Sequence, residues 1–203
     1  MKKITAYCRL TDDLVILNGK PCEISFPSEP GPGRLTDIYR HLEVGYPKFF
    51  KMDNLSKAGF LASEMVLRSL QYDMETPDES TSIVFCNRSS SLDTDKRFQE
   101  TISRDNYFPS PAVFVYTLPN IVTGEVAIRN KIFGETSFYI SSGFSAKELI
   151  ITAEGAFDGK GIRRVLCGWT EYFKDACDVL VMMVEKDAAE GLDFTEKNIN
   201  QIY

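Results

Sequence analysis

The chain has 203 residues, 43% of them hydrophobic and 12% aromatic, which suffices for one globular domain with a buried core. Its net charge of -6 argues against a nucleic-acid groove as the main surface. The chain has one histidine, and its five cysteines include no Cys-x-x-Cys pair, so we expect free thiols, no metal site and no cofactor.

The sequence also argues against a membrane segment. The longest uninterrupted apolar run, 179–184, is far too short to span a bilayer. In the N-terminal segment, polar residues such as Arg9 and Asp12 interrupt the apolar core that a signal peptide would need. We therefore expect a cytoplasmic protein without a membrane span.

The first half of the chain contains one clear predicted helix, over 55–70, with an apolar stripe along one side. Within this helix Glu64 and Arg68 have the i, i+4 spacing of an ion pair. Short apolar or alternating runs predict three strands in this half, at 4–9, 14–17 and 82–87.

Three lysines near the start of the 55–70 helix, Lys48, Lys51 and Lys57, form the most basic local cluster. Such a cluster is most often a solvated face. The alternative interpretation is a docking patch for an acidic partner.

The chain is organised around residues 109–171. Leu118-Pro119-Asn120 is a turn that opens a helix ending at Asn130. Residues 136–141 alternate like a strand, Ser142-Gly143 forms a sharp turn, and 144–157 have helical spacing. A turn between a strand and a helix lies at the positive helix N-terminus, a position that suits a nucleophile or an anion.

Two more strands are predicted after this turn, at 165–170 and 177–185. The alternation of strands and helices predicts an α/β protein with a mixed, mostly parallel sheet of about five strands flanked by helices. The last residues, 192–203, are expected to form a polar C-terminal tail, with Thr195 as a cap for one helical turn.

The central stretch resembles the N-terminal half of the β-ketoacyl synthases, the condensing enzymes of the thiolase-like superfamily. The resemblance runs from a Ser-Pro pair through Leu-Pro-Asn and Gly-Glu-x-Ala-Ile-Arg to the Cys-Gly-Trp-Thr-Glu motif that ends at Glu171. It implies half of a thiolase-like fold, with 1–191 as the synthase-like domain.

The sequence departs from this family at the nucleophile. Counting from Gly134, the family's catalytic cysteine falls on Gly143, which has no side chain. The histidines of the family's active site belong to its C-terminal half, and the one histidine here, His41, lies far before the turn. A serine beside the turn would need a general base. The resemblance therefore implies an elbow without condensing chemistry, and its candidate acyl-binding residues are Asn120, Ser141, Ser142, Gly143 and Phe144.

Three functions remain open at this point. The first is a non-catalytic subunit, similar to the chain-length factors, that pairs with an active synthase in fatty acid, polyketide or aryl polyene biosynthesis. The second is a stand-alone module that binds an acyl chain or an acyl carrier protein. The third is a hydrolase or acyltransferase.

The resemblance also implies where partners would bind. In the synthases the strand before the nucleophile pairs across a two-fold axis, so we expect a dimer, with a synthase or with a second copy, through the strand residues Ser137, Phe138, Tyr139 and Ile140. An acyl carrier protein would dock on Lys48, Lys51 and Lys57.

Overall fold

The computed structural model describes residues 1–26, 31–102 and 108–203. Over these residues eight strands form one sheet: β1 (Lys2–Thr11), β2 (Val15–Leu17), β3 (Lys20–Pro21), β4 (Thr81–Asn87), β5 (Thr136–Ile140), β6 (Arg164–Phe173), β7 (Ala176–Lys186) and β8 (Leu192–Asp193). The helices are α1 (Pro32–His41), α2 (Asn54–Ser69), α3 (Leu92–Glu100), α4 (Pro111–Phe114), α5 (Ile121–Asn130), α6 (Ala146–Phe157) and α7 (Glu196–Ile202), with 3-10 turns at Pro47–Lys51 and Val115–Thr117.

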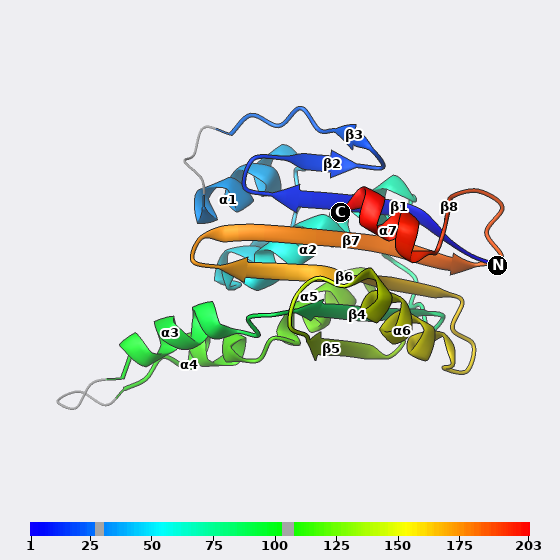
Figure 1. Cartoon of the computed structure of the whole chain (residues 1–203). Helices are drawn as coiled ribbons and strands as arrows, with labels where there is room; N and C mark the ends of the chain where they lie inside the picture. The colour runs from blue at the N-terminus through cyan, green and yellow to red at the C-terminus, as the bar shows by residue number, and fades with distance from the viewer. Residues whose placement is uncertain (27–30, 103–107) are drawn as a thin grey trace.

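The strands follow the order β3-β2-β1-β7-β6-β4-β5, and β8 pairs with the first residues of β1. Figure 1 shows this sheet with β5 at one edge and β3 at the other. Only the pairings of β4 with β5 and of β4 with β6 are parallel, and the other pairings are antiparallel.

The α/β class is confirmed, but the prediction of about five mostly parallel strands is wrong in number and in direction. Lys174 and Asp175 both have positive φ and turn β6 back onto β7 as a hairpin. Asn18-Gly19 does the same between β2 and β3. Helices lie between β4 and β5 and between β5 and β6, and both parallel pairings are among these three strands.

Two apolar cores lie on opposite faces of the sheet. The larger joins α1, α2 and α5 to one face, and the smaller joins α6 and α7 to the other. Side chains of β7 alternate between them: Val181 belongs to the first core and Met182 to the second. The parallel β4–β5–β6 region thus carries helices on both faces, as in other α/β proteins.

Helix α2 is the central element of the larger core. The Asp53 carboxylate caps it by accepting a hydrogen bond from the Ser56 N–H at 3.0 Å. The predicted pair of Glu64 and Arg68 is confirmed at 3.2 Å, and Arg129 of α5 binds the other oxygen of the same buried carboxylate at 3.2 Å. Two guanidinium groups therefore stabilise the negative charge of a carboxylate whose burial would otherwise be unfavourable.

Residues 192–203 are polar in composition but fold onto the body of the protein. Leu192 and Asp193 pair with β1, and Thr195 caps α7 by accepting from the Asn198 N–H at 3.3 Å. Ile199 is fully buried in the smaller core. The segment packs against α6 and closes one side of it (Figure 1).

Candidate functional site

The predicted strand, turn and helix meet at 140–146. Ser141 continues the parallel ladder by donating its N–H to the Asn87 carbonyl at 2.9 Å. Its hydroxyl donates to the Gly143 carbonyl at 2.9 Å, which closes the turn. Ser145 then caps α6 by accepting from the Glu148 N–H at 3.2 Å. This elbow places residue 143 just before the positive end of a twelve-residue helix.

Glycine at position 143 is not required by the backbone. A Cβ built on Gly143 meets no heavy atom within 4 Å in the part of the chain that the structure describes. A Cβ on Gly134, nine residues earlier, would lie 2.1 Å from the Thr81 carbonyl oxygen, so that glycine is required by packing. The elbow therefore has space for a nucleophile that the sequence does not provide.

The thiols and the histidine are poorly placed for chemistry at the elbow. Burial raises the pKa of the Cys86 thiol to about 12, and burial likewise holds the pKa of Cys167 well above its ordinary value. Both thiols therefore stay protonated near neutral pH. His41 is exposed at the end of α1, on the face of the sheet opposite to α6.

Phe144 is engaged by aromatic side chains of the protein itself. Its ring stacks on Tyr203 with centroids 3.5 Å apart and lies edge-on to Trp169 at 6.2 Å. The Tyr203 hydroxyl donates to Asp178 at 2.6 Å, and the Arg9 guanidinium lies 4.4 Å from the Tyr203 ring. The C-terminal segment thus covers the elbow and the start of α6.

The sequence analysis missed Tyr203 because the polar composition of 192–203 hid an apolar side. The signal was the spacing of Ile199, Ile202 and Tyr203, which lie three and four residues apart behind the cap at Thr195.

The elbow residues proposed from sequence are only partly brought together. Ser141, Ser142, Gly143 and Phe144 are consecutive at the elbow, whereas Asn120 is exposed at the start of α5, which packs on the other face of the sheet.

The four residues expected in a dimer lie in an edge strand. Along β5, Ser137 and Phe138 are half-buried, while Tyr139 is 45% and Ile140 is 53% exposed. The Glu135 carbonyl and the Ser141 N–H form hydrogen bonds with β4. Backbone groups of successive residues point to opposite sides of a strand, so the N–H groups of Phe138 and Ile140 point to the open edge. In the described residues no strand pairs with that edge.

The three lysines of the predicted docking patch have different roles. Lys48 forms a 2.9 Å ion pair with the buried Glu125 carboxylate, so its charge is already neutralised. Lys51 and Lys57 line one cavity together with Lys96 and Arg97 of α3. The sequence analysis missed Lys96 and Arg97, because only the fold brings α3 next to the start of α2.

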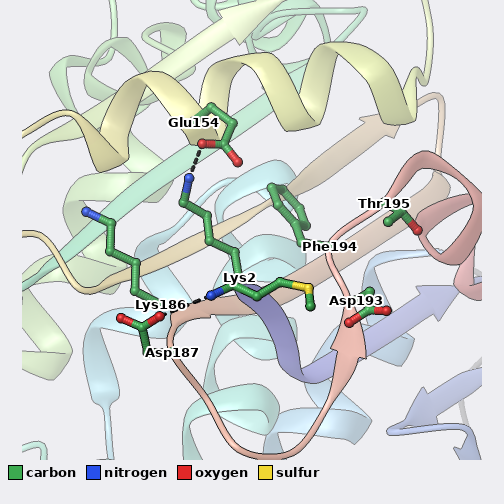
Figure 2. A pocket seen from close by; sticks show the side chains of 8 residues that line it. Lys2, Glu154, Lys186, Asp187, Asp193, Phe194 and Thr195 are labelled. Atoms are coloured by element: carbon green, nitrogen blue, oxygen red, sulfur yellow. Dashed lines mark hydrogen bonds and ion pairs between the residues drawn. The ribbon is translucent and has the colours of Figure 1, made fainter.

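A second cavity, of about 410 Å³, lies between the N-terminus, α6 and the segment before α7 (Figure 2). Its charged groups are paired. Lys2 binds Glu154, the Met1 amine binds Asp187 at 3.0 Å, and Lys186 donates to two backbone carbonyls at 3.0 Å each. The positive groups of this cavity are therefore already bound by carboxylates or carbonyls of the chain itself.

The described residues hold neither a cluster of metal ligands nor a single membrane-spanning helix. No group of three His, Cys, Asp or Glu side chains is arranged to hold a metal ion. No single helix there is long and apolar enough to cross a membrane. The one pair of helical segments that passes on length and composition, Pro111–Thr117 and Ile121–Asn130, is bent by 98°.

No family model and no curated protein matches the chain. Solved structures do match it. The ishigamide ketosynthase/chain length factor matches with a TM-score of 0.69 and 16% identity, over 93% of this chain and 63% of that one. A ketosynthase in complex with its chain length factor from Xenorhabdus doucetiae matches with a TM-score of 0.60 and 14% identity, over 93% of this chain and 80% of that one.

A third match is a type II polyketide acyl-carrier protein in complex with its ketosynthase, with a TM-score of 0.59 and 14% identity, over 92% of this chain and 62% of that one. The chain therefore spans about 63% of the length of the first of these proteins. At these identities the likeness concerns the fold: the chain shares the fold of the part of these ketosynthase and chain length factor structures that it covers.

Proposed function

We propose that the chain is a non-catalytic, chain-length-factor-like subunit that pairs with an active ketosynthase in polyketide, aryl polyene or fatty acid biosynthesis. The observation that carries the proposal is the open edge of β5, where two apolar side chains are exposed on an uncharged strand. The matched structures include a ketosynthase in complex with its chain length factor and a carrier protein in complex with its ketosynthase, and these complexes support the choice of partner.

The chemistry of the β5 edge supports a partner strand. Phe138 and Ile140 direct N–H groups outward, and an unpaired edge of this kind readily pairs with another chain. The surrounding elements add exposed apolar side chains, Ile128 on α5, Phe133 before β5 and Ile151 on α6. Burying them against a partner would contribute about 25 cal/mol for each Å² of apolar surface, before the costs of association.

The elbow supports a role without condensation. A condensing enzyme needs a thiolate and groups that promote decarboxylation, and position 143 supplies no thiol. Burial raises the pKa of the Cys86 and Cys167 thiols and keeps them protonated. In this proposal the elbow is retained for its architecture, which positions β5 and α6 for the partner.

The alternative function is a stand-alone module that binds an acyl carrier protein. The cavity lined by Lys51, Lys57, Lys96 and Arg97 favours it, because cationic side chains attract an acidic protein. Carrier binding at this cavity, unlike the stand-alone role, would also be compatible with a complex with a synthase.

The test is co-expression with candidate ketosynthases, followed by hydrogen–deuterium exchange of the purified complex. The proposal predicts that a synthase co-purifies and that the amides of Phe138 and Ile140 exchange more slowly in the complex than in the isolated chain. Co-purification without protection of these two amides would place the interface elsewhere. A chain that stays monomeric with every synthase would favour the binding module.

A further inference from the structure

The cavity lined by Lys51, Lys57, Lys96 and Arg97 has a volume of about 580 Å³ and lies between the starts of α1 and α2 and one side of α3. Pro32 opens α1, Asn54 opens α2, and α3 contributes Asp93 from its first turn. This is large enough for a phosphate group together with part of the molecule that carries it. We call the space the cationic basin.

The four cations of the basin lack carboxylate partners within ion-pair distance among the described residues. Lys57 and Lys96 instead lie over aromatic rings, those of Phe49 at 5.7 Å and Phe173 at 4.9 Å. The cavity in Figure 2 is the opposite case, because its lysines and its N-terminal amine are bound by carboxylates and carbonyls. The basin therefore has positive charge available to a ligand.

Three carboxylates also line the basin, and two of them have partners of their own. Asp93 accepts from the Lys174 N–H at 3.3 Å, and Asp175 accepts from the Tyr172 hydroxyl at 3.3 Å. The third, Glu100, is exposed at the end of α3. These carboxylates reduce the net charge of the basin without neutralising any one cation.

Repulsion between two of the cations favours an anion in the basin. Burial lowers the pKa of Lys57, and repulsion from Arg97 lowers it further, whereas attraction to Asp53 raises it. An anion that contacts both Lys57 and Arg97 would therefore relieve an existing repulsion.

We propose that the cationic basin binds a phosphate ester, with Lys57 and Arg97 as its principal contacts. The planar fork of a guanidinium matches two phosphate oxygens, and the ammonium group of a lysine supplies a compact third donor. The phosphate belongs either to a small metabolite or to the prosthetic arm of a carrier protein, and only the second source rests on the proposed function.

The first arm of the test is titration of the full chain with inorganic phosphate and with glycerol 3-phosphate, followed by calorimetry and backbone amide shifts at low ionic strength. The expected result is saturable binding with Kd below about 1 mM, and weakening of about tenfold or more in Lys57→Gln and in Arg97→Gln. Lys20→Gln, an equal charge change on the exposed strand β3, should bind as the wild type does.

The second arm compares a carrier protein with and without its phosphodiester-linked arm. If the carrier with its prosthetic group binds more tightly and glycerol 3-phosphate competes with it, the phosphate is assigned to the carrier. If the two forms bind equally and the phosphate titrations show saturable binding, the phosphate is assigned to a metabolite. Circular dichroism confirms that each variant is folded.

The absence of saturable binding to every probe would overturn the proposal, and so would equal weakening by Lys20→Gln. These results are separate from complex formation with a synthase, so the phosphate site and the subunit function can fail independently.

Discussion

The two edge strands of the sheet differ in how readily they could pair with a strand of another chain. At one end β3 has two residues, Lys20 and Pro21. Proline has no N–H to donate, and an exposed lysine discourages pairing, so this edge is closed by its composition. At the other end β5 has five residues without charge or proline, and it exposes Tyr139 and Ile140. The comparison favours β5 over β3 as the edge that the proposed partner would cover.

The largest expected effect is on association through β5. Tyr139→Asp places a charge in the proposed interface, where an unpaired buried charge costs about 2–5 kcal/mol. Affinity for a synthase or a second copy should therefore fall by well over about tenfold, with the fold unchanged. Sedimentation velocity measures the affinity. The matched control is Lys20→Asp on β3, which should leave association unaltered.

The next effect is on the support of β5 within the chain. Gly134→Ala would bring a methyl group to 2.1 Å from the Thr81 carbonyl, at the turn that leads into β5. Relief of that clash requires a backbone shift, and we expect a loss of about 1–3 kcal/mol in the free energy of unfolding, measured by urea denaturation. Gly143→Ala is the control, since its methyl meets open space and should change stability by less than about 0.5 kcal/mol. Equal effects of the two substitutions would contradict this account.

A smaller, pH-dependent effect on stability is expected at Asp78, which forms an isolated parallel β-bridge with Ile132 shortly before β5. Burial alone would raise the pKa of Asp78, but hydrogen bonds from Thr81, Tyr72 and Ser80 outweigh burial and hold that pKa below its ordinary value. Ionised Asp78 therefore stabilises the fold above the unfolded-state pKa of about 4, and this contribution is lost as the pH falls.

Asp78→Asn should accordingly lower the free energy of unfolding by about 1 kcal/mol at pH 7. The difference from the wild type should shrink as the pH falls below about 4. Urea denaturation at several pH values provides the measurement, and a difference that stays constant with pH would refute the role assigned to this carboxylate.

The smallest structural effect is expected at the elbow itself. Gly143→Cys should fold normally, and the N-terminus of α6 should lower the pKa of the new thiol, which alkylation by iodoacetamide at varied pH would report. The isolated chain should still not condense acyl and malonyl thioesters, because a thiol alone does not supply the groups that promote decarboxylation. Turnover by this variant would show that the elbow needs only a nucleophile.

The sequence predicts the β5 edge better than the β3 edge, for a physical reason. Strand β5, the elbow and α6 are consecutive in the chain, so local alternation and turn residues are enough to locate them. The antiparallel part of the sheet depends on pairing between distant segments: Lys2 pairs with Lys186, which no local pattern encodes. The Asn18-Gly19 turn is a sequence signal for the β2–β3 hairpin, yet the sequence analysis predicts only β2.

The candidate sites show the same limit. Position 143 was located by counting from Gly134, but the space around it could be judged only in three dimensions. Lys51 and Lys57 were identified as a basic cluster, whereas Lys96 and Arg97 join them through the packing of α3 beside α2. Lys48 was grouped with them by sequence, although Glu125 binds its charge.

The most direct test of the central claim is the mass in solution of the chain mixed with its candidate synthase, measured by sedimentation for the wild type and for Ile140→Pro. The N–H of Ile140 points to the open edge, so proline there removes a donor to a partner strand without removing a bond to β4. The account predicts a one-to-one complex for the wild type and separated chains for the variant. A wild type that remains monomeric alone and in the mixture, or a variant that associates equally well, would contradict it.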